Sequence, residues 1–282
     1  MKILSLFDGI SCGRVALERA GIPVEKYYAS EIDKYAIRVA QKNYPDTIQV
    51  GDVTQIDGSK FRDIDILIGG SPCQGFSFAG KQLNFEDPRS KLFFEYVRIL
   101  NEIKPKYFLL ENVCMKKECE DVISQALGVF PMMINSSLVS AQNRKRLYWT
   151  NISKVTRPKD RGIVWGDVRE HGVPSGAFYY TDKAKNWIHR HEERTGKKLK
   201  IFDDGDKMQM LEASMHKKYS SQRFFGINDT YGIRYITPLE CERCQTLPDE
   251  YTSCVSNTQR YIQLGNGWTV DVVAHILGFV NT

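Results

Sequence analysis

The sequence has no long hydrophobic run, since no segment approaches the roughly 18 uninterrupted apolar residues that a membrane-spanning helix needs. The N-terminal stretch MKILSLFDGI carries an apolar run too short for a secretory signal peptide, and it lacks a small-residue cleavage site. We therefore expect an intracellular, cytoplasmic protein. With 282 residues, 42% of them hydrophobic, the chain can form one sizeable core, or a large domain beside a small one.

The sequence also lacks a disulfide framework. Its seven cysteines are odd in number and irregular in spacing, which argues against structural disulfides. Cys241 and Cys244 form one half of a zinc-site pattern, but a second Cys-x-x-Cys or a histidine pair is missing. We expect no metal and favour reduced thiols on a helix.

Excess positive charge is confined to one segment. The whole chain has a net charge of +5, and the window from Arg157 to Arg234 alone holds 16 Lys and Arg against 11 Asp and Glu. The rest of the chain is therefore neutral. A localised basic segment suits a polyanion such as nucleic acid, although a solvated lysine-rich surface would have the same composition.

The first 150 residues alternate strand-like and helix-like patterns. Such a rhythm predicts an α/β fold with a mixed, mostly parallel sheet and helices on both faces. Ligands of such sheets bind beyond the carboxyl ends of the strands. The expected strands are 2–7, 26–32, 47–52, 63–70 and 106–113, and the expected helices are 11–21, 33–44 (capped by Asp33) and 89–103.

The pattern breaks after residue 152. Residues 157–232 are polar, rich in glycine and charge, and weakly periodic, which indicates a small irregular second domain. Strong apolar patterning returns at 261–280 and predicts a helix that packs back on the first domain. We expect one domain from 1–156 and 261–282, and a second from 157–260.

The stretch LFDGISCG (6–13) runs from a strand through a glycine turn into a helix. Gly9 and Gly13 allow a ligand to approach the backbone, and the spacing is not the Gly-x-Gly-x-x-Gly of dinucleotide sites. Glu31 follows the second strand, where a carboxylate can accept hydrogen bonds from ribose hydroxyls. Asp52 follows the third strand and can accept from an adenine amino group. Together they suggest an adenosine-containing ligand.

The stretch GGSPCQGFSFAG (69–80) sets Cys73 on a loop after the fourth strand, at the same edge of the sheet. A buried core cysteine needs no such approach, whereas a reactive thiol does. The fifth strand would place Glu111 beside it as a possible proton donor. Arg144 and Arg146, two apart on an extended segment, would face one side and donate to oxygens or phosphates.

These stretches resemble the motifs of the cytosine-5 DNA methyltransferases, in that family's order and over essentially the whole chain. LFDGISCG, SEID and GDV resemble the cofactor motifs, and GGSPCQGFS resembles the catalytic Pro-Cys motif. ENV (111–113), QNRKR (142–146), RYITPLECERCQTLP (234–248) and GNGW (265–268) resemble the glutamate, Gln-x-Arg-x-Arg, domain-joining and final motifs. The loop after Cys73 is similar to bacterial and phage members, and Trp268 to the animal de novo enzymes.

The resemblance implies an S-adenosylmethionine-dependent methyltransferase fold with a small target-recognition domain, acting on double-stranded DNA. Cys73 would attack C6 of a flipped-out cytosine, and Glu111 would donate a hydrogen bond or a proton to N3. Arg146 would hold O2, while Arg144 would support the loop or a phosphate. The residues implied in binding S-adenosyl-L-methionine are Phe7, Asp8, Gly9, Gly13, Glu31, Ile32, Asp52, Val53, Pro72, Leu92, Asn266 and Trp268.

Two alternatives keep the same fold. A branch of the family methylates cytosine in transfer RNA, and degenerate members serve as catalytically silent DNA-binding scaffolds. The separate recognition segment favours DNA, and the intact Pro-Cys and Glu-Asn-Val motifs favour activity. A thiol-redox enzyme would explain neither Glu111 nor the arginine pair. We expect no membrane partner, and a monomer or a weak homo-oligomer.

Overall fold

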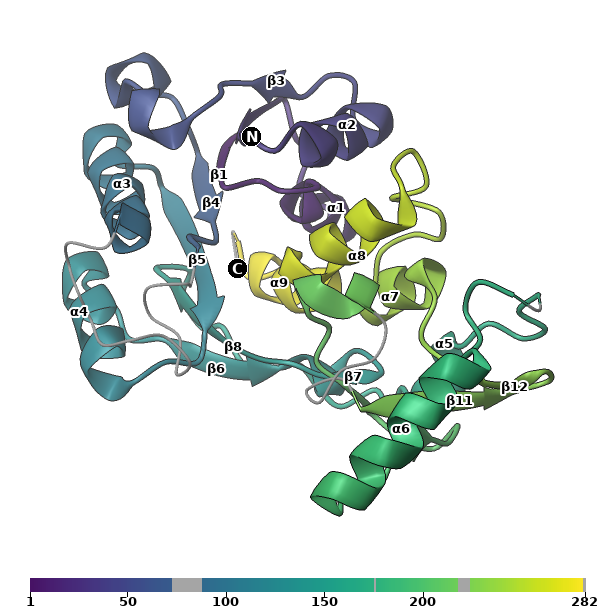
Figure 1. Ribbon diagram of the computed structural model, residues 1–282. Coiled ribbons are helices and arrows are strands. Elements are labelled where there is room, and N and C mark those ends of the chain that lie inside the picture. The colour runs from purple at the N-terminus through teal and green to yellow at the C-terminus, as the bar shows by residue number, and fades with distance from the viewer. Residues whose placement is uncertain (73–87, 175, 218–223, 281–282) are drawn as a thin grey trace. The chain divides into compact units, whose positions relative to one another are not determined.

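The computed structural model describes residues 1–72, 88–174, 176–217 and 224–280. The chain divides into two compact units, which Figure 1 shows as ribbons. The first unit comprises Met1–Ser136, Lys145–Pro158 and Val270–Thr282, and the second comprises Ser137–Arg144 and Lys159–Thr269. In the part of the chain that is described, no helix is long and apolar enough to cross a membrane.

A seven-stranded mixed sheet forms the centre of the first unit. Its strand order is β3-β2-β1-β4-β5-β8-β6. The first five pair in parallel, and β8 runs antiparallel to both β5 and β6. This confirms the predicted mixed, mostly parallel sheet. The strands are β1 Lys2–Leu6, β2 Lys26–Ser30, β3 Ile48–Gln49, β4 Ile66–Gly69, β5 Tyr107–Val113, β6 Met132–Asn135 and β8 Lys145–Thr150.

Helices cover both faces of this sheet, as Figure 1 shows, with α3 and α4 on one side and α1, α2 and α9 on the other. The predicted cap of α2 is confirmed, because the Asp33 carboxylate accepts the backbone N–H groups of Tyr35 and Ala36. Gly128, at φ 70°, ends α4 in the left-handed region that glycine adopts without strain. These helices are α1 Cys12–Arg19, α2 Lys34–Asn43, α3 Pro88–Ile103, α4 Lys117–Leu127 and α9 Val270–Leu277.

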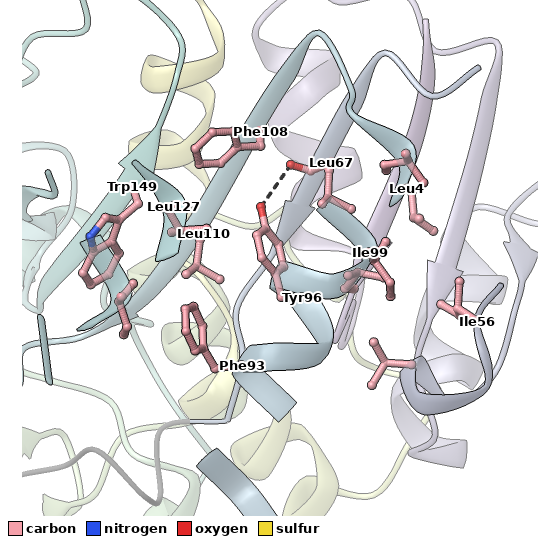
Figure 2. Packing of buried hydrophobic residues seen from close by; sticks show 14 of the residues in the cluster. Leu4, Ile56, Leu67, Phe93, Tyr96, Ile99, Phe108, Leu110, Leu127 and Trp149 are labelled. Atoms are coloured by element: carbon pink, nitrogen blue, oxygen red, sulfur yellow. Dashed lines mark hydrogen bonds between the residues drawn. The ribbon is translucent and has the colours of Figure 1, made fainter. Parts of the chain in front are cut away.

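The core between the sheet and α3 and α4 consists of large apolar side chains (Figure 2). Alternate residues of the strands enter it, so Leu4 and Leu6 of β1 and Leu110 of β5 pack against Phe93 and Ile99 of α3, as the period of two requires. Its two polar tips have partners. Tyr96 Oη lies 3.5 Å from the carbonyl of Leu67, and Trp149 Nε1 donates to Ser124 Oγ at 2.9 Å. This packing fixes the strands whose ends form the site described below.

The expected single helix over 261–280 is wrong, because the chain forms α8 Asn257–Asn266 and then α9. Gly267 has extended backbone (φ −67°, ψ 168°), which ends α8. The guanidinium of Arg144 accounts for the break, because it donates hydrogen bonds to the carbonyls of Gly265 and Gly267. Helix α9 belongs to the first unit and α8 to the second. In the first unit, Asp271 of α9 pairs with Arg19 at 2.6 Å.

The second unit is more regular than its composition suggested. It contains a three-stranded sheet of order β12-β11-β9, a short pair β10-β7, and a helix α6 of 14 residues. Thr181 caps the first turn of α6 and Gly196 ends it at φ 69°. The elements are β7 Gln142–Asn143, α5 Trp165–Val168, α6 Asp182–Thr195, β9 Lys200–Phe202, β10 Met208–Gln209, β11 Phe225–Asp229, β12 Gly232–Arg234 and α7 Pro238–Cys244, with short 3-10 turns elsewhere.

Arg234 anchors the second unit as a fully buried cation. It pairs with Glu240 at 2.7 Å and with Asp229 at 2.5 Å, and both carboxylates are buried with it. A buried charge is tolerated only when it is paired and hydrogen-bonded, so loss of any one of these three side chains would leave an uncompensated charge and destabilise the unit.

The division into units differs from the expected domains in three places. Residues 157–158 belong to the first unit, whereas we expected them in the second domain. Residues 137–144 and 261–269 belong to the second unit, whereas we expected both in the first domain. The reason is a set of hydrogen bonds from Gln142 and Arg144 to carbonyls of residues 211, 244, 265 and 267. The functional division into a catalytic and a recognition domain stays a prediction.

Candidate active site

An ion pair between Glu111 and Arg146 lies at the carboxyl edge of the parallel strands. Glu111 is near the end of β5, and Arg146 is near the start of the antiparallel β8, where it pairs with Val113. Arg146 Nε lies 3.0 Å from Glu111 Oε1, and both residues are 8% exposed. One strand end therefore presents a carboxylate and a guanidinium together in a largely desolvated place, where both act more strongly than in water.

The segment that leads to Cys73 is held at the same edge. Asn112 Nδ2, next to Glu111, donates to Ser71 Oγ at 3.2 Å and approaches the Ser71 carbonyl at 3.4 Å. Both residues are buried. Pro72 follows, and Cys73 itself lies outside the described residues. The structure thus joins the approach to the Pro-Cys motif with the Glu-Asn-Val motif, in agreement with the predicted adjacency of the fourth and fifth strands.

Arg144 does not share its environment with Arg146, so the expectation that both face one side is corrected. Its guanidinium donates to the carbonyls of Leu211 at 2.9 Å, Gly265 at 3.1 Å and Gly267 at 2.9 Å. Arg144 is 2% exposed and falls between β7 and β8, where the chain passes from the second unit to the first. The role that the resemblance implied for Arg144, support of the loop or of a phosphate, stays a prediction.

Gln142 and Gln245 extend this hold on residues 264–269, and we call Gln142, Arg144 and Gln245 the polar clasp. Gln245 Nε2 donates to the carbonyls of Leu264 and Gly267, and its Oε1 accepts from Gln142 Nε2 and Thr269 Oγ1. Both glutamines are completely buried. The clasp therefore fixes the turn that carries Asn266, which is exposed, and Trp268, which is half-buried.

Gly265 has to be glycine for this turn to pack. A Cβ atom there would lie 2.1 Å from the backbone N of Ala213 and from the carbonyl carbon of Glu212. No side chain fits at that distance, so the backbone of α8 at Gly265 packs directly against the backbone of Glu212 and Ala213.

The Asp8 carboxylate points inward. It accepts hydrogen bonds from Ser11 Oγ at 2.5 Å and Tyr27 Oη at 2.6 Å, and it is almost entirely buried. Burial raises its pKa from the ordinary 3.8 to about 6, against the lowering effect of its hydroxyl partners. Asp8 thus shapes the turn after β1 through its bonds to Ser11 and Tyr27, and its part in binding the cofactor stays a prediction.

Glu31 organises the opposite side of that turn. Its Oε2 accepts Gly9 N at 2.8 Å, and its Oε1 accepts Ile32 N at 2.7 Å and Asp33 N at 2.8 Å. A carboxylate has about four lone-pair sites, so one remains for a hydroxyl of a ligand. Gly9, at φ 60°, has no atom within 4 Å of a built Cβ, so open space adjoins this carboxylate.

The other predicted cofactor residues divide into exposed and buried ones. Asp52 is exposed and uses Oδ1 to accept Thr54 N at 2.9 Å, and Ile32 is 75% exposed next to Glu31. Phe7, at φ 56°, and Leu92 are half-buried against the core. Val53 and Gly13, by contrast, are buried, and their predicted contacts with the cofactor would be made by the backbone.

This donor set fits an adenosine-containing cofactor. Two carboxylates at adjacent strand ends retain acceptor capacity for ribose and amino hydrogens, and an exposed isoleucine offers an apolar surface for a ring. The open space at Gly9 permits close approach of a ligand to the backbone.

Cys241 and Cys244 lie on α7, as expected of thiols on a helix. Both are free and buried, and burial raises the pKa of each thiol. In the described part of the chain, no group of three or more His, Cys, Asp or Glu side chains could hold a metal ion.

A family model described as C-5 cytosine-specific DNA methylase matches residues 1–280. The chain belongs to this family. It is 33% identical to the type II methyltransferase M.NlaX of Neisseria lactamica, over 98% of this chain and 94% of the relative. It is 30% identical to M.HpaII of Haemophilus parainfluenzae, over 96% of this chain and 86% of the relative.

Solved structures show the same fold at lower identity. The methyltransferase EhMeth of Entamoeba histolytica superposes with a TM-score of 0.81 at 18% identity, over 99% of this chain and 97% of that one. A DNMT2 protein of Spodoptera frugiperda gives 0.77 at 22% identity, over 100% and 99%. The chain is thus an enzyme, a DNA cytosine-5 methyltransferase that uses S-adenosyl-L-methionine.

Replacing Asp8 with Asn tests the buried carboxylate. Because the folded-state pKa is raised, the wild type is stabilised by the neutral form at low pH and loses that contribution as the pH rises from about 4 to 6. The shift corresponds to about 3 kcal/mol. Urea unfolding at pH 4, 5, 6 and 7 should show Asp8→Asn gaining on the wild type by up to that amount. A difference that is constant with pH would contradict the assignment.

Replacing Gln245 with Leu tests the polar clasp. The carbonyl of Leu264 and the hydroxyl of Thr269 would each lose a hydrogen bond in a buried place, at a cost of roughly 2–5 kcal/mol in total. Urea unfolding measures it, with Gln125→Leu on the exposed side of α4 as the matched control. A loss below about 1 kcal/mol, equal to that of the control, would mean that the clasp does not hold the turn.

Proposed function

We propose that this enzyme methylates C5 of a cytosine flipped out of duplex DNA at a specific short site, with Cys73 as nucleophile. The observation that carries the proposal is the Glu111–Arg146 pair beside the Ser71–Pro72 approach. A thiol that follows this approach would enter a place that already holds an acid and a cation. C6 of a stacked base is out of reach of a side chain, so the base has to leave the helix.

In the proposed reaction the Cys73 thiolate forms a bond to C6 of cytosine. Electron density moves through the ring toward N3 and O2 as that bond forms. Glu111 donates a proton or a hydrogen bond at N3, and Arg146 donates to O2, so the charge that develops on the ring is matched in a water-poor place. C5 becomes nucleophilic, and after it is methylated a base removes the C5 proton and the C6–sulfur bond breaks. Cys73 is thereby regenerated.

The bound cofactor supplies the methyl group that C5 accepts. Glu31 would accept from a ribose hydroxyl through its remaining lone pair, and Asp52 from the adenine amino group. Ile32 would cover one face of the ring, and Asn266 and Trp268 would complete the methionine end. The clasp would serve catalysis by holding the backbone of that last turn in one conformation.

We further propose that the substrate is double-stranded, that the enzyme works in the cytoplasm of a prokaryotic cell or phage-infected host, at the nucleoid, and that it acts as a monomer or weak homo-oligomer. The basic segment between Arg157 and Arg234 supports the polyanion partner. The match to type II methyltransferases of bacteria supports the setting.

The experiment supplies purified enzyme with labelled S-adenosylmethionine and offers unmethylated genomic DNA and bulk transfer RNA in parallel. Bisulfite sequencing then maps the modified cytosines. Label in DNA at one short sequence is expected. Label only in RNA would contradict the proposed substrate, and label in neither would contradict the proposed activity.

Glu111→Gln in the same assay tests the acid. Turnover should fall by about 10²–10⁴-fold, because an amide cannot donate the proton at N3. Cofactor affinity should be unchanged. Glu118→Gln, an exposed carboxylate on α4, is the matched control and should retain activity. A Glu111→Gln enzyme with undiminished turnover would remove Glu111 from the mechanism.

A further inference from the structure

Helix α6 is anchored in the second unit by one side only. Its buried residues are Ala184, Ile188 and His191, which recur at helical spacing and leave the remaining sides to solvent. Trp187 and His191 of α6, the long helix in Figure 1, contact the ring of Phe224, which directly precedes β11. Its exposed sides are therefore displayed on a fixed scaffold.

The carboxylates of α6 all have partners. Asp182 pairs with Lys185 at 3.4 Å and Glu193 with His189 at 3.3 Å. Glu192 lies 3.6 Å from Lys198 Nζ and accepts Leu199 N at 2.8 Å. Asp182, His189 and Glu193 follow one another at spacings of seven and four, so they lie on one face.

The neighbouring face is cationic and has no such partners. Lys183, Asn186, Arg190 and Arg194 are spaced by three, four and four residues and are all exposed. We call them the cationic face. Within the described ranges no carboxylate pairs with its three cations. Arg190 Nε donates only to the carbonyl of Asn186 at 3.3 Å, and Arg194 Nη2 contacts His191 Nδ1 at 3.4 Å.

This arrangement is unfavourable for the free protein. Arg190 and Arg194 are like charges at a spacing of four, which destabilises a helix, and a carboxylate at either position would remove the repulsion. The repulsion is relieved when an anionic polymer lies against the face. The cations span about 16 Å along the helix axis, which matches an extended row of charges better than a single small anion.

We propose that the cationic face of α6 binds the sugar-phosphate backbone of the DNA substrate without reading bases. The inference rests on the proposed function, because it takes duplex DNA as the polymer. A helix inserted in the major groove has phosphates on both sides. The adjoining face with Asp182 and Glu193 would then meet phosphates, so α6 lies against one strand from outside. Such a contact supplies affinity and orientation and leaves sequence choice to other residues.

The test compares two double variants of equal charge change. R190Q/R194Q removes cations of the face, whereas K185Q/K198Q removes cations that are paired with carboxylates. Glutamine has nearly the helix propensity of both residues, so folding is preserved and thermal unfolding verifies it. DNA affinity is measured against salt concentration for the wild type and both variants, with a duplex that contains the mapped site.

The R190Q/R194Q protein should lower the slope of log affinity against log salt by about 1.8, or about 0.9 per contact. The K185Q/K198Q protein should keep most of the wild-type slope. Methylation by R190Q/R194Q at low salt should occur at the same DNA sequence as in the wild type. That assay also separates the two proposals, because a wild type that binds DNA but does not methylate it contradicts the proposed function and leaves the face intact.

Four results would overturn the inference. Equal slopes for the two variants would mean that net charge alone matters, and an unchanged slope for R190Q/R194Q would mean that the face does not touch DNA. A changed target sequence would mean that α6 reads bases. The same titrations are repeated with transfer RNA in place of DNA. A slope change in R190Q/R194Q that is seen with RNA but not with DNA would also contradict the inference.

Discussion

The antiparallel pairing of β8 against β5 is the constraint on which the site depends. Five parallel strands place loops at one edge of the sheet, but parallel order alone brings no cation to the end of β5. The register that sets Arg146 opposite Val113 carries the guanidinium to within 3.0 Å of Glu111. Both groups are buried, so each neutralises the charge of the other. Removing either would leave an uncompensated charge in the protein interior. The ion pair to which we assign the catalytic role thus also contributes to the stability of the sheet.

In the second unit, buried side chains hold the backbone of residues 264–269 in place. Residues 264–269 form a turn whose carbonyls point at the side chains of Gln245 and Arg144, and Gly265 leaves no room for a side chain. Gln142 and Gln245 bond to each other, and Gln245 and Arg144 donate to the carbonyls of this turn, so its backbone is held in one conformation. A turn that is to meet a ligand has to be rigid before the ligand arrives, since ordering it on binding would weaken affinity.

Much of this architecture was predictable because its signals are local. β4 ends at Gly69, Glu31 directly follows β2, Asp33 caps its helix, and Glu111 lies in the mostly buried strand β5. What could not be predicted depends on distant partners. The break after α8 is caused by an arginine far earlier in the chain, and the inward turn of Asp8 depends on Tyr27 from the next strand. Helix α6 was missed because only a narrow stripe of it is apolar, at Ala184 and Ile188. The Gln245 contacts were missed because glutamine has no pattern of its own.

The central claim is that a thiol at position 73 attacks cytosine beside Glu111 and Arg146. The most direct measurement incubates the enzyme and S-adenosylmethionine with a duplex that carries 5-fluorocytosine at the mapped target, followed by mass spectrometry of the protein–DNA adduct. Fluorine cannot leave C5 as a proton does, so the covalent intermediate should persist with one DNA strand attached to Cys73, and Cys73→Ser should form none. Absence of an adduct from an enzyme that methylates normal DNA would contradict the mechanism. An adduct on Cys114, the thiol that directly follows β5 and lies close to Arg146, would contradict the identity of the nucleophile.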